Sequence, residues 1–122
     1  MGEAHLQREW EREEVVILVV EYFRTKGFPS QERTSVYQEI SDFLRHREEI
    51  STGAPVSDTF RNYAGIYMQS GRIRCLDPDT AYCGMQGTKL QKEIVQEYLE
   101  NPSQLIKEAE QIYQKYEWNP SI

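Results

Sequence analysis

Residues 15–20 are all apolar, and this run limits most strongly which folds the chain can adopt. Glutamates precede the run, where negative charge suits the positive end of a helix dipole. We therefore predict a helix over residues 8–25, although a buried strand is the alternative for so short an apolar run. The polar flanks and the total length favour the helix. Its apolar face also includes Trp10, Tyr22 and Phe23.

Capping signals and apolar spacing predict further helices. Ser35 stands three residues before Gln38, and Thr88 three residues before Gln91, which is the spacing of a capping box. Ser103 follows a proline break and is expected to cap the last helix. The prediction is an all-α fold in a single domain, residues 1–122. The expected helices are 8–25, 35–47, 58–70, 89–100 and 104–117.

The third of these helices is expected to lie between two end signals. Ser57 is a suitable N-cap, and Gly71 can supply the left-handed residue that closes a helix. An apolar stripe toward the core would then consist of Phe60, Tyr63, Ala64, Tyr67 and Met68. Residues 72–87 show neither helical nor strand periodicity, so we predict a long ordered loop before the fourth helix.

Polar side chains on the third helix predict a binding surface. Arginine, asparagine and glutamine can each form paired hydrogen bonds with a phosphate or a base edge. The chain has a net charge of −6, which opposes DNA binding, but residues 55–92 carry five basic and three acidic side chains. A solvated helix face is the alternative. The candidate DNA-contacting residues are Arg61, Asn62, Gln69, Arg72, Arg74 and Lys89.

Several classes of protein are not expected from this sequence. Two histidines and the absence of a nucleotide-binding or metalloprotease motif argue against an enzyme, a cofactor or a metal site. Asp77 and Asp79 flank Pro78 as in a turn. No apolar run has membrane-spanning length, and the N-terminus lacks signal-peptide character, so we expect a cytoplasmic protein. Cys75 and Cys83 are then expected to be free thiols.

An ordered series of short motifs covers nearly the whole chain and resembles a known module. The series resembles the N-terminal helical module, similar to Myb or SANT domains, that precedes the nuclease domain of bacterial HNH restriction-type endonucleases. The residues that carry the resemblance are Trp10-Glu11-Arg12-Glu13-Glu14, Glu21-Tyr22-Phe23, Thr59-Phe60-Arg61-Asn62 with Gly65, Ile66 and Met68, Leu76-Asp77-Pro78, and Gly84 with Gly87-Thr88-Lys89-Leu90.

The resemblance implies that the first three helices are arranged like a helix-turn-helix. It also implies DNA recognition without cleavage, because the HNH domain has no counterpart in these residues. It places recognition on Arg61, Asn62 and the start of the glycine-bearing loop. The chain departs from the family at Gln69, where a basic residue is common, and at Gly71-Arg72-Ile73-Arg74, which replaces the Asn-Phe that often stands before Leu-Asp-Pro. Trp10, Phe60, Gly65 and Leu76 are expected to build the fold. Arg61 has the alternative role of a buried partner for a first-helix glutamate.

Three hypotheses follow from the sequence. The first is a non-enzymatic module that binds DNA, plain or modified, in a restriction or phage-defence system whose nuclease lies on another chain. The second is an acidic adaptor or DNA mimic that binds a basic partner protein. The third, which rests only on fold analogy, is a subunit of a homodimeric transcription regulator. The sequence itself predicts no oligomeric state. The adaptor would use Glu93, Glu97, Glu100, Glu108 and Glu110.

Overall fold

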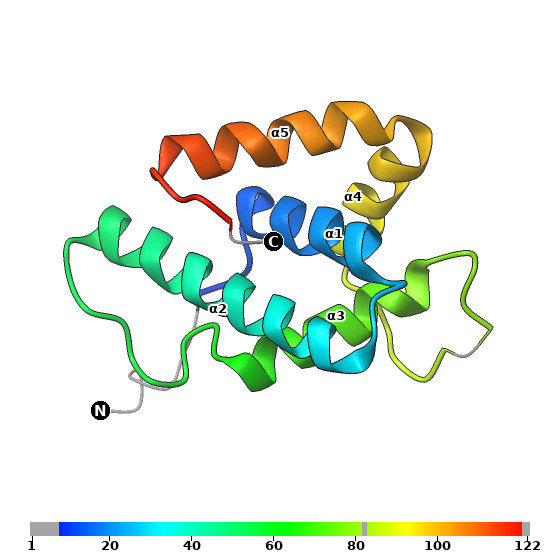
Figure 1. Cartoon of the computed structure of the whole chain (residues 1–122), viewed down its shortest axis with the longest axis horizontal. Coiled ribbons are helices and arrows are strands. Elements are labelled where there is room, and N and C mark those ends of the chain that lie inside the picture. The colour runs from blue at the N-terminus through cyan, green and yellow to red at the C-terminus, as the bar shows by residue number, and fades with distance from the viewer. Residues whose placement is uncertain (1–7, 82, 121–122) are drawn as a thin grey trace.

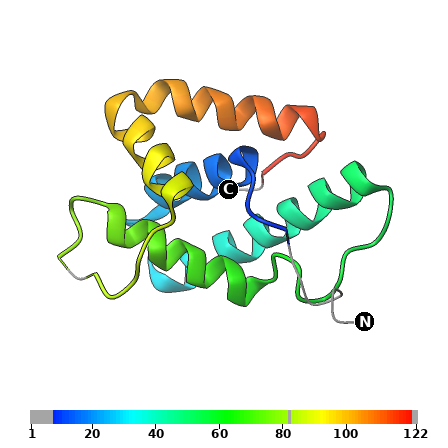
Figure 2. The ribbon, with the colours of Figure 1, turned by 180° about the vertical axis from the view of Figure 1, so that it is seen from behind.

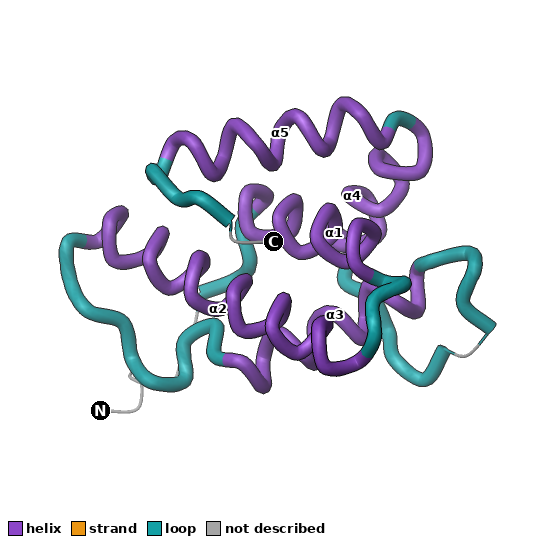
Figure 3. The backbone as a smooth tube through the Cα atoms, in the orientation of Figure 1, coloured by secondary structure: helices purple, strands orange, loops and turns teal. Residues whose placement is uncertain are grey.

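The computed structural model describes residues 8–81 and 83–120, and the regular structure in these residues is entirely helical. The all-α prediction is therefore confirmed (Figure 3). Five helices follow one another along the described chain: α1 (Arg12–Thr25), α2 (Ser30–Thr52), α3 (Tyr63–Leu76), α4 (Lys89–Glu100) and α5 (Pro102–Lys115).

Helix α1 is the centre of the fold. It contacts each of the other four helices. In Figure 1 it lies between α5 and the α2–α3 pair, and the view from behind in Figure 2 shows the same order. Residues 15–20 are at most 4% exposed, so the apolar run is buried around the whole circumference of the helix. Because burying an apolar side chain contributes about 1.5–3 kcal/mol, this run supplies much of the driving force for folding.

The remaining helices each direct apolar residues toward α1. These residues form one continuous cluster with the buried run, as expected for a small domain with a single core. The fully buried members outside α1 include Phe43 and Leu44 of α2, Ile66 and Ile73 of α3, Ile94 of α4 and Leu105 of α5.

Helices α1 and α2 begin at residues other than those predicted, as do α3 and α5. Helix α1 starts at Arg12 rather than residue 8, and the carboxylate of Glu14 accepts a hydrogen bond from the Glu11 N–H at 2.9 Å. Helix α2 starts at Ser30, directly after Pro29, so Ser35 lies inside the helix and does not cap it. Helix α2 also continues past residue 47 to Thr52, where Gly53 (φ 72°) closes it in the left-handed conformation.

Helix α3 shows the largest difference from the sequence prediction. It begins at Tyr63 and not at residue 58, because Asn62 caps it with its side chain. It also continues through Gly71 to Leu76, so the loop before α4 is shorter than predicted. The later start changes the buried face. Tyr67 and Met68 are 62% and 43% exposed, and Ile66 and Ile73 occupy the core positions instead.

The last two helices agree with the prediction more closely. Helix α4 has the predicted bounds and the predicted capping box between Thr88 and Gln91. Helix α5 begins two residues early, because Asn101 rather than Ser103 accepts the capping hydrogen bond, from Gln104 N. Among the described residues, no helix has both the length and the apolar character needed to cross a membrane.

Candidate functional site

Arg61 lies inside the fold and only 3% of it is exposed. Its guanidinium donates to both carboxylate oxygens of Glu14, from Nε at 2.9 Å and from Nη2 at 3.2 Å. Glu14 is completely buried. Two parallel hydrogen bonds in this fork arrangement are the strongest form of the arginine–carboxylate pair. Of the two roles that the sequence left open for Arg61, the structure has the buried partner of a first-helix glutamate.

Two aromatic rings enclose the Arg61 guanidinium. The rings of Trp10 and Phe60 each lie 4.4 Å from it, measured from the guanidinium carbon to the ring centroid. The backbone of Arg61 has φ 45°, an uncommon conformation for a residue with a side chain. Ser41 of α2 stabilises it by donating to the Arg61 carbonyl oxygen at 2.7 Å. Arg61 therefore positions the turn before α3.

An ion-pair network connects this region to α2 and α5. Arg47 of α2 donates to Glu11 at 2.7 Å and to Glu13 at 2.9 Å. Lys115 also binds Glu13, at 2.9 Å. Burial alone would raise the pKa values of Glu13 and Glu14, but hydrogen bonds from their cationic partners outweigh it, and the net effect lowers both.

The lowered pKa values of Glu13 and Glu14 predict acid sensitivity. A carboxylate whose pKa is lower in the folded state stabilises that state above its unfolded pKa, near 4.5 for glutamate. The stabilisation is lost as the pH falls through the lower folded value. We expect urea unfolding to show that Glu14→Gln is less stable than the wild type at neutral pH and that this difference shrinks at acid pH. A difference that is constant with pH would contradict the assignment.

The side chain of Asn62 is occupied by capping. Its Oδ1 accepts from the N–H of Gly65 at 2.9 Å. A Cβ atom at Gly65 would lie 3.3 Å from the same oxygen, so the glycine accommodates the cap rather than a close approach of two helices. Asn62 therefore has a structural role at the start of α3.

Three other candidates, Gln69, Arg72 and Lys89, lie toward α4. Gln69 accepts a hydrogen bond from Gln91 at 2.7 Å, and Arg72 donates from Nη1 to the Gln86 carbonyl at 2.8 Å. Lys89 is exposed at the first turn of α4. Since successive residues of a helix turn by about 100°, Arg72 and Arg74 point about 200° apart. The six predicted residues thus do not form one contact surface.

Arg74 is exposed and shares a face of α3 with two tyrosines. Tyr63, Tyr67 and Arg74 are spaced by four and seven residues, which places them along one stripe of the helix. Tyr37 of α2 packs against both tyrosines, with its ring centroid 6.2 Å from that of Tyr63 and 5.7 Å from that of Tyr67. The three rings form a cluster at the α2–α3 boundary.

Arg33 lies one turn before Tyr37 on α2 and completes this surface. Burial raises the pKa of Tyr37, and the positive charges of Arg33 and Arg74 oppose that rise, so both guanidinium groups lie close enough to act on the ring. The Nε of Arg33 is buried and has no hydrogen-bond partner among the described residues. We call this set the tyrosine–arginine face: Arg33, Tyr37, Tyr63, Tyr67 and Arg74.

The charge on the two sides of the molecule differs. Helix α3 contains no Asp or Glu, whereas each of the other four helices of the described chain contains at least two. On the α4–α5 side, Arg12 binds Glu97 at 2.7 Å and Glu108 at 2.9 Å. Two of the five glutamates proposed for an acidic adaptor are therefore already paired with a cation of the same chain.

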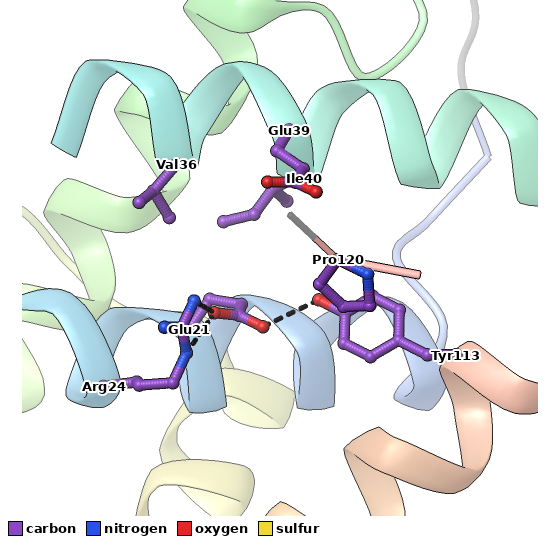
Figure 4. Close-up of a pocket in the computed structure, with 7 residues that line it drawn as sticks. All are labelled: Glu21, Arg24, Val36, Glu39, Ile40, Tyr113 and Pro120. Carbon is purple, nitrogen blue, oxygen red and sulfur yellow. Dashed lines mark hydrogen bonds and ion pairs between the residues drawn. The ribbon is translucent and has the colours of Figure 1, made fainter. Parts of the chain in front are cut away.

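A pocket between α1, α2 and the C-terminal segment offers little chemistry. Its cavity volume is about 10 Å³, far below the roughly 300–1,000 Å³ of typical small-molecule sites. Figure 4 shows Glu21 between Arg24 and Tyr113, and Tyr113 donates to the Glu21 carboxylate at 2.8 Å. Burial and the Glu21 charge raise the pKa of Tyr113 far above its usual value. Three polar side chains of the pocket thus bind one another rather than a substrate, because Arg24 also donates to Glu21.

Other site types can be assessed within residues 8–81 and 83–120. No three His, Cys, Asp or Glu side chains in these ranges converge as a metal site would require. Asp77 instead accepts from Tyr22 and from Lys26, at 2.8 Å each, and from the N–H of Asp79 in a turn. In comparisons with known proteins, no family model, no curated protein and no solved structure matches this chain significantly.

Proposed function

We propose that the chain is a non-enzymatic DNA-binding module and that the tyrosine–arginine face is its contact surface. The proposal rests on the exposed ring of Tyr67, which lies on the same stripe of α3 as Arg74, two turns away, on a helix without carboxylates. Arginines near aromatic rings are the usual components of sites that bind a phosphate backbone and stack on bases. Arg33 and Arg74 would bind phosphates, and Tyr67 would stack on a base.

The hydrogen bonds that the amide side chains already form favour stacking of a base on Tyr67 over hydrogen bonding to base edges. Asn62 and Gln69 were the residues expected to form paired hydrogen bonds with a base, but the first caps α3 and the second binds Gln91. A base edge would have to displace these bonds. A ring that is 62% exposed, as in Tyr67, needs no such rearrangement. The proposal therefore favours DNA with unpaired bases over an intact duplex read by α3 in the manner of a helix-turn-helix.

The charge distribution supports the choice of this face. The net charge of −6 repels DNA at long range, so binding requires a surface from which carboxylates are absent. The glutamates of α5 lie on a helix that shares no contacts with α3, and α1 lies between the two helices in Figure 1. The resemblance to the recognition module of HNH endonucleases agrees with a role in restriction or defence, with cleavage by another chain.

Binding of labelled single-stranded and duplex DNA, followed by fluorescence anisotropy at several salt concentrations, tests the proposal. We expect Arg74→Ala to weaken binding and to reduce the salt slope by about 0.7, the value for one phosphate contact on a single strand. Tyr67→Ala should cost about 1–3 kcal/mol through the loss of stacking. Tyr67→Phe, which retains the ring, should bind nearly as the wild type does.

Lys107→Ala is the matched control. It removes one exposed cation from α5, so it changes the net charge by the same amount as Arg74→Ala. If both variants weaken binding equally, the tyrosine–arginine face has no specific role. If the wild type binds neither form of DNA at low salt, the proposed function is overturned.

A further inference from the structure

Three consecutive residues of the loop before α4 are attached to α3. The Sδ of Met85 lies 2.9 Å from the position that a Cβ at Gly71 would occupy, so this side chain packs directly on the helix backbone. The carbonyl oxygen of Gln86 accepts a hydrogen bond from Arg72 Nη1 at 2.8 Å. A Cβ at Gly87 would lie 2.6 Å from the side chain of the last residue of α3. In Figure 2 this segment passes α3 on its way to α4.

The first of these contacts brings Met85 to the tyrosine–arginine face. Gly71 follows Tyr67 by four residues and precedes Arg74 by three. At about 100° per residue, the three positions point within about 60° of one another, so they share one side of α3. Gly71 has no side chain, and Met85 covers the helix at this point instead. The Met85 thioether therefore lies on the face, at a level of α3 between Tyr67 and Arg74.

The ring of Tyr67 is open on the side toward Met85. Tyr63 lies one turn before it on α3, with a centroid distance of 6.4 Å. Tyr37 meets it from α2, edge to face, at 5.7 Å. These two rings cover the N-terminal side and the α2 side of Tyr67, which is still 62% exposed. The open surface of the ring is therefore the one that faces Gly71 and Met85.

The space between Tyr67 and Met85 suits a flat group. Tyr67 and Gly71 are about 6 Å apart along the helix axis, since each residue adds about 1.5 Å. Long side chains in a helix lean toward its N-terminus, which moves the Tyr67 ring away from Gly71 and widens the gap. A flat base with carbon contacts of 3.5–4.0 Å on each side needs roughly 7–8 Å. One base therefore fits between the ring and the thioether.

We propose that Met85 is a further DNA-binding residue, which holds an unpaired base against Tyr67 while Arg74 binds the adjoining phosphate. This inference rests on the proposed function, because Tyr67 must stack on a base. A thioether is polarizable, makes favourable contacts with aromatic groups and adapts through three rotatable bonds. Methionine is also one of the apolar side chains that insert between bases in DNA complexes. The site thus binds the flat faces of a single unpaired base.

Single-stranded DNA that carries one 2-aminopurine tests the role of Met85. We expect Met85→Ala to weaken binding about two- to tenfold, the range of sulfur–aromatic contacts. The salt slope should not change, because no phosphate contact is lost. At saturation the quenching of 2-aminopurine should be smaller than with the wild type, which a merely displaced loop would not cause. Met85→Leu, which retains an apolar side chain, should keep most of the affinity.

Gly71→Ala tests the same contact without changing Met85. The added methyl group would occupy the place of the thioether, so Met85 must move off the face. We expect the same loss as in Met85→Ala, and no additional loss when both substitutions are combined. Gly27→Ala is the matched control, because a Cβ at Gly27 meets nothing within 4 Å. Far-UV circular dichroism confirms that each variant is folded.

Two results would overturn this inference. One is full affinity and full 2-aminopurine quenching in Met85→Ala. The other is additive losses in the variant that combines Gly71→Ala with Met85→Ala. If Tyr67→Ala and Arg74→Ala still weaken binding in either case, the proposed function stands and only the role of Met85 is lost. Absence of DNA binding by the wild type would overturn both.

Discussion

Arg61→Ala is expected to lower the free energy of unfolding by up to about 3–5 kcal/mol, the usual cost of breaking a buried ion pair by removing one partner, because Glu14 then keeps only its ion pair with Arg8, at 2.7 Å. Glu14 is completely buried, and in this variant it loses both hydrogen bonds from the guanidinium. The rings of Trp10 and Phe60 also lose the cation between them. Urea unfolding, monitored by far-UV circular dichroism, measures the difference.

Arg12→Ala is the control for this prediction. Arg12 also binds two glutamates, but its side chain is 46% exposed, so removing it should cost only about 0–1 kcal/mol for each pair. Arg61→Lys should also be destabilised, because an ammonium group cannot form the two parallel bonds of the fork. The double variant Glu14→Leu with Arg61→Met should be more stable than Arg61→Ala, since no buried charge is left alone. A loss in Arg61→Ala no larger than in Arg12→Ala would refute the structural role.

Phe43→Ala is expected to cost about 3–5 kcal/mol, as is typical of removing a buried phenylalanine. The Phe43 side chain is fully buried, and its ring meets Tyr113, Tyr116 and Trp118 edge to face, at centroid distances of 4.8, 6.0 and 5.7 Å. The substitution therefore leaves a cavity and removes the ring contacts between Phe43 and the end of the chain. The near-UV circular dichroism of the aromatic cluster should decrease in the folded protein.

Phe43→Leu separates the cost of the cavity from the cost of the lost ring contacts. Leucine fills most of the volume, so the cost should stay below about 1.5 kcal/mol. The near-UV signal should still decrease, because the ring contacts are lost. Equal destabilisation of the two variants would show that the ring contacts, and not the cavity, determine the stability.

The sequence predicted those parts of the fold in which the signal is local. The apolar run 15–20 predicts α1 wherever the other helices lie, and the capping box of Thr88 and Gln91 predicts α4. The start of α3, in contrast, is not determined by a local sequence signal. Ser57 and Asn62 are both suitable caps, and the choice between them depends on α2. Ser41 donates to the carbonyl of Arg61, and Arg45 donates to the carbonyls of Ser57 and Phe60.

The tyrosine–arginine face was not predicted from the sequence, for a related reason. Tyr67 and Arg74 were both noted in the sequence, one as core and the other as a DNA contact, because the predicted helix began five residues too early. The cluster with Tyr37 depends on how α2 packs against α3, which no local pattern encodes. The spacing of Tyr63 and Tyr67, on a segment without carboxylates, was the available signal.

The central position of α1 has a consequence for the synthesis of the protein. Helix α1 is translated first, but one of its sides is covered by α5, which ends at Lys115. At about 5–20 residues per second, roughly 5–20 s pass before the ribosome has made that last covering segment. During this time the six apolar side chains remain open to chaperones or to other nascent chains, so the yield of folded protein in a cell should depend on how fast the second half of the message is read.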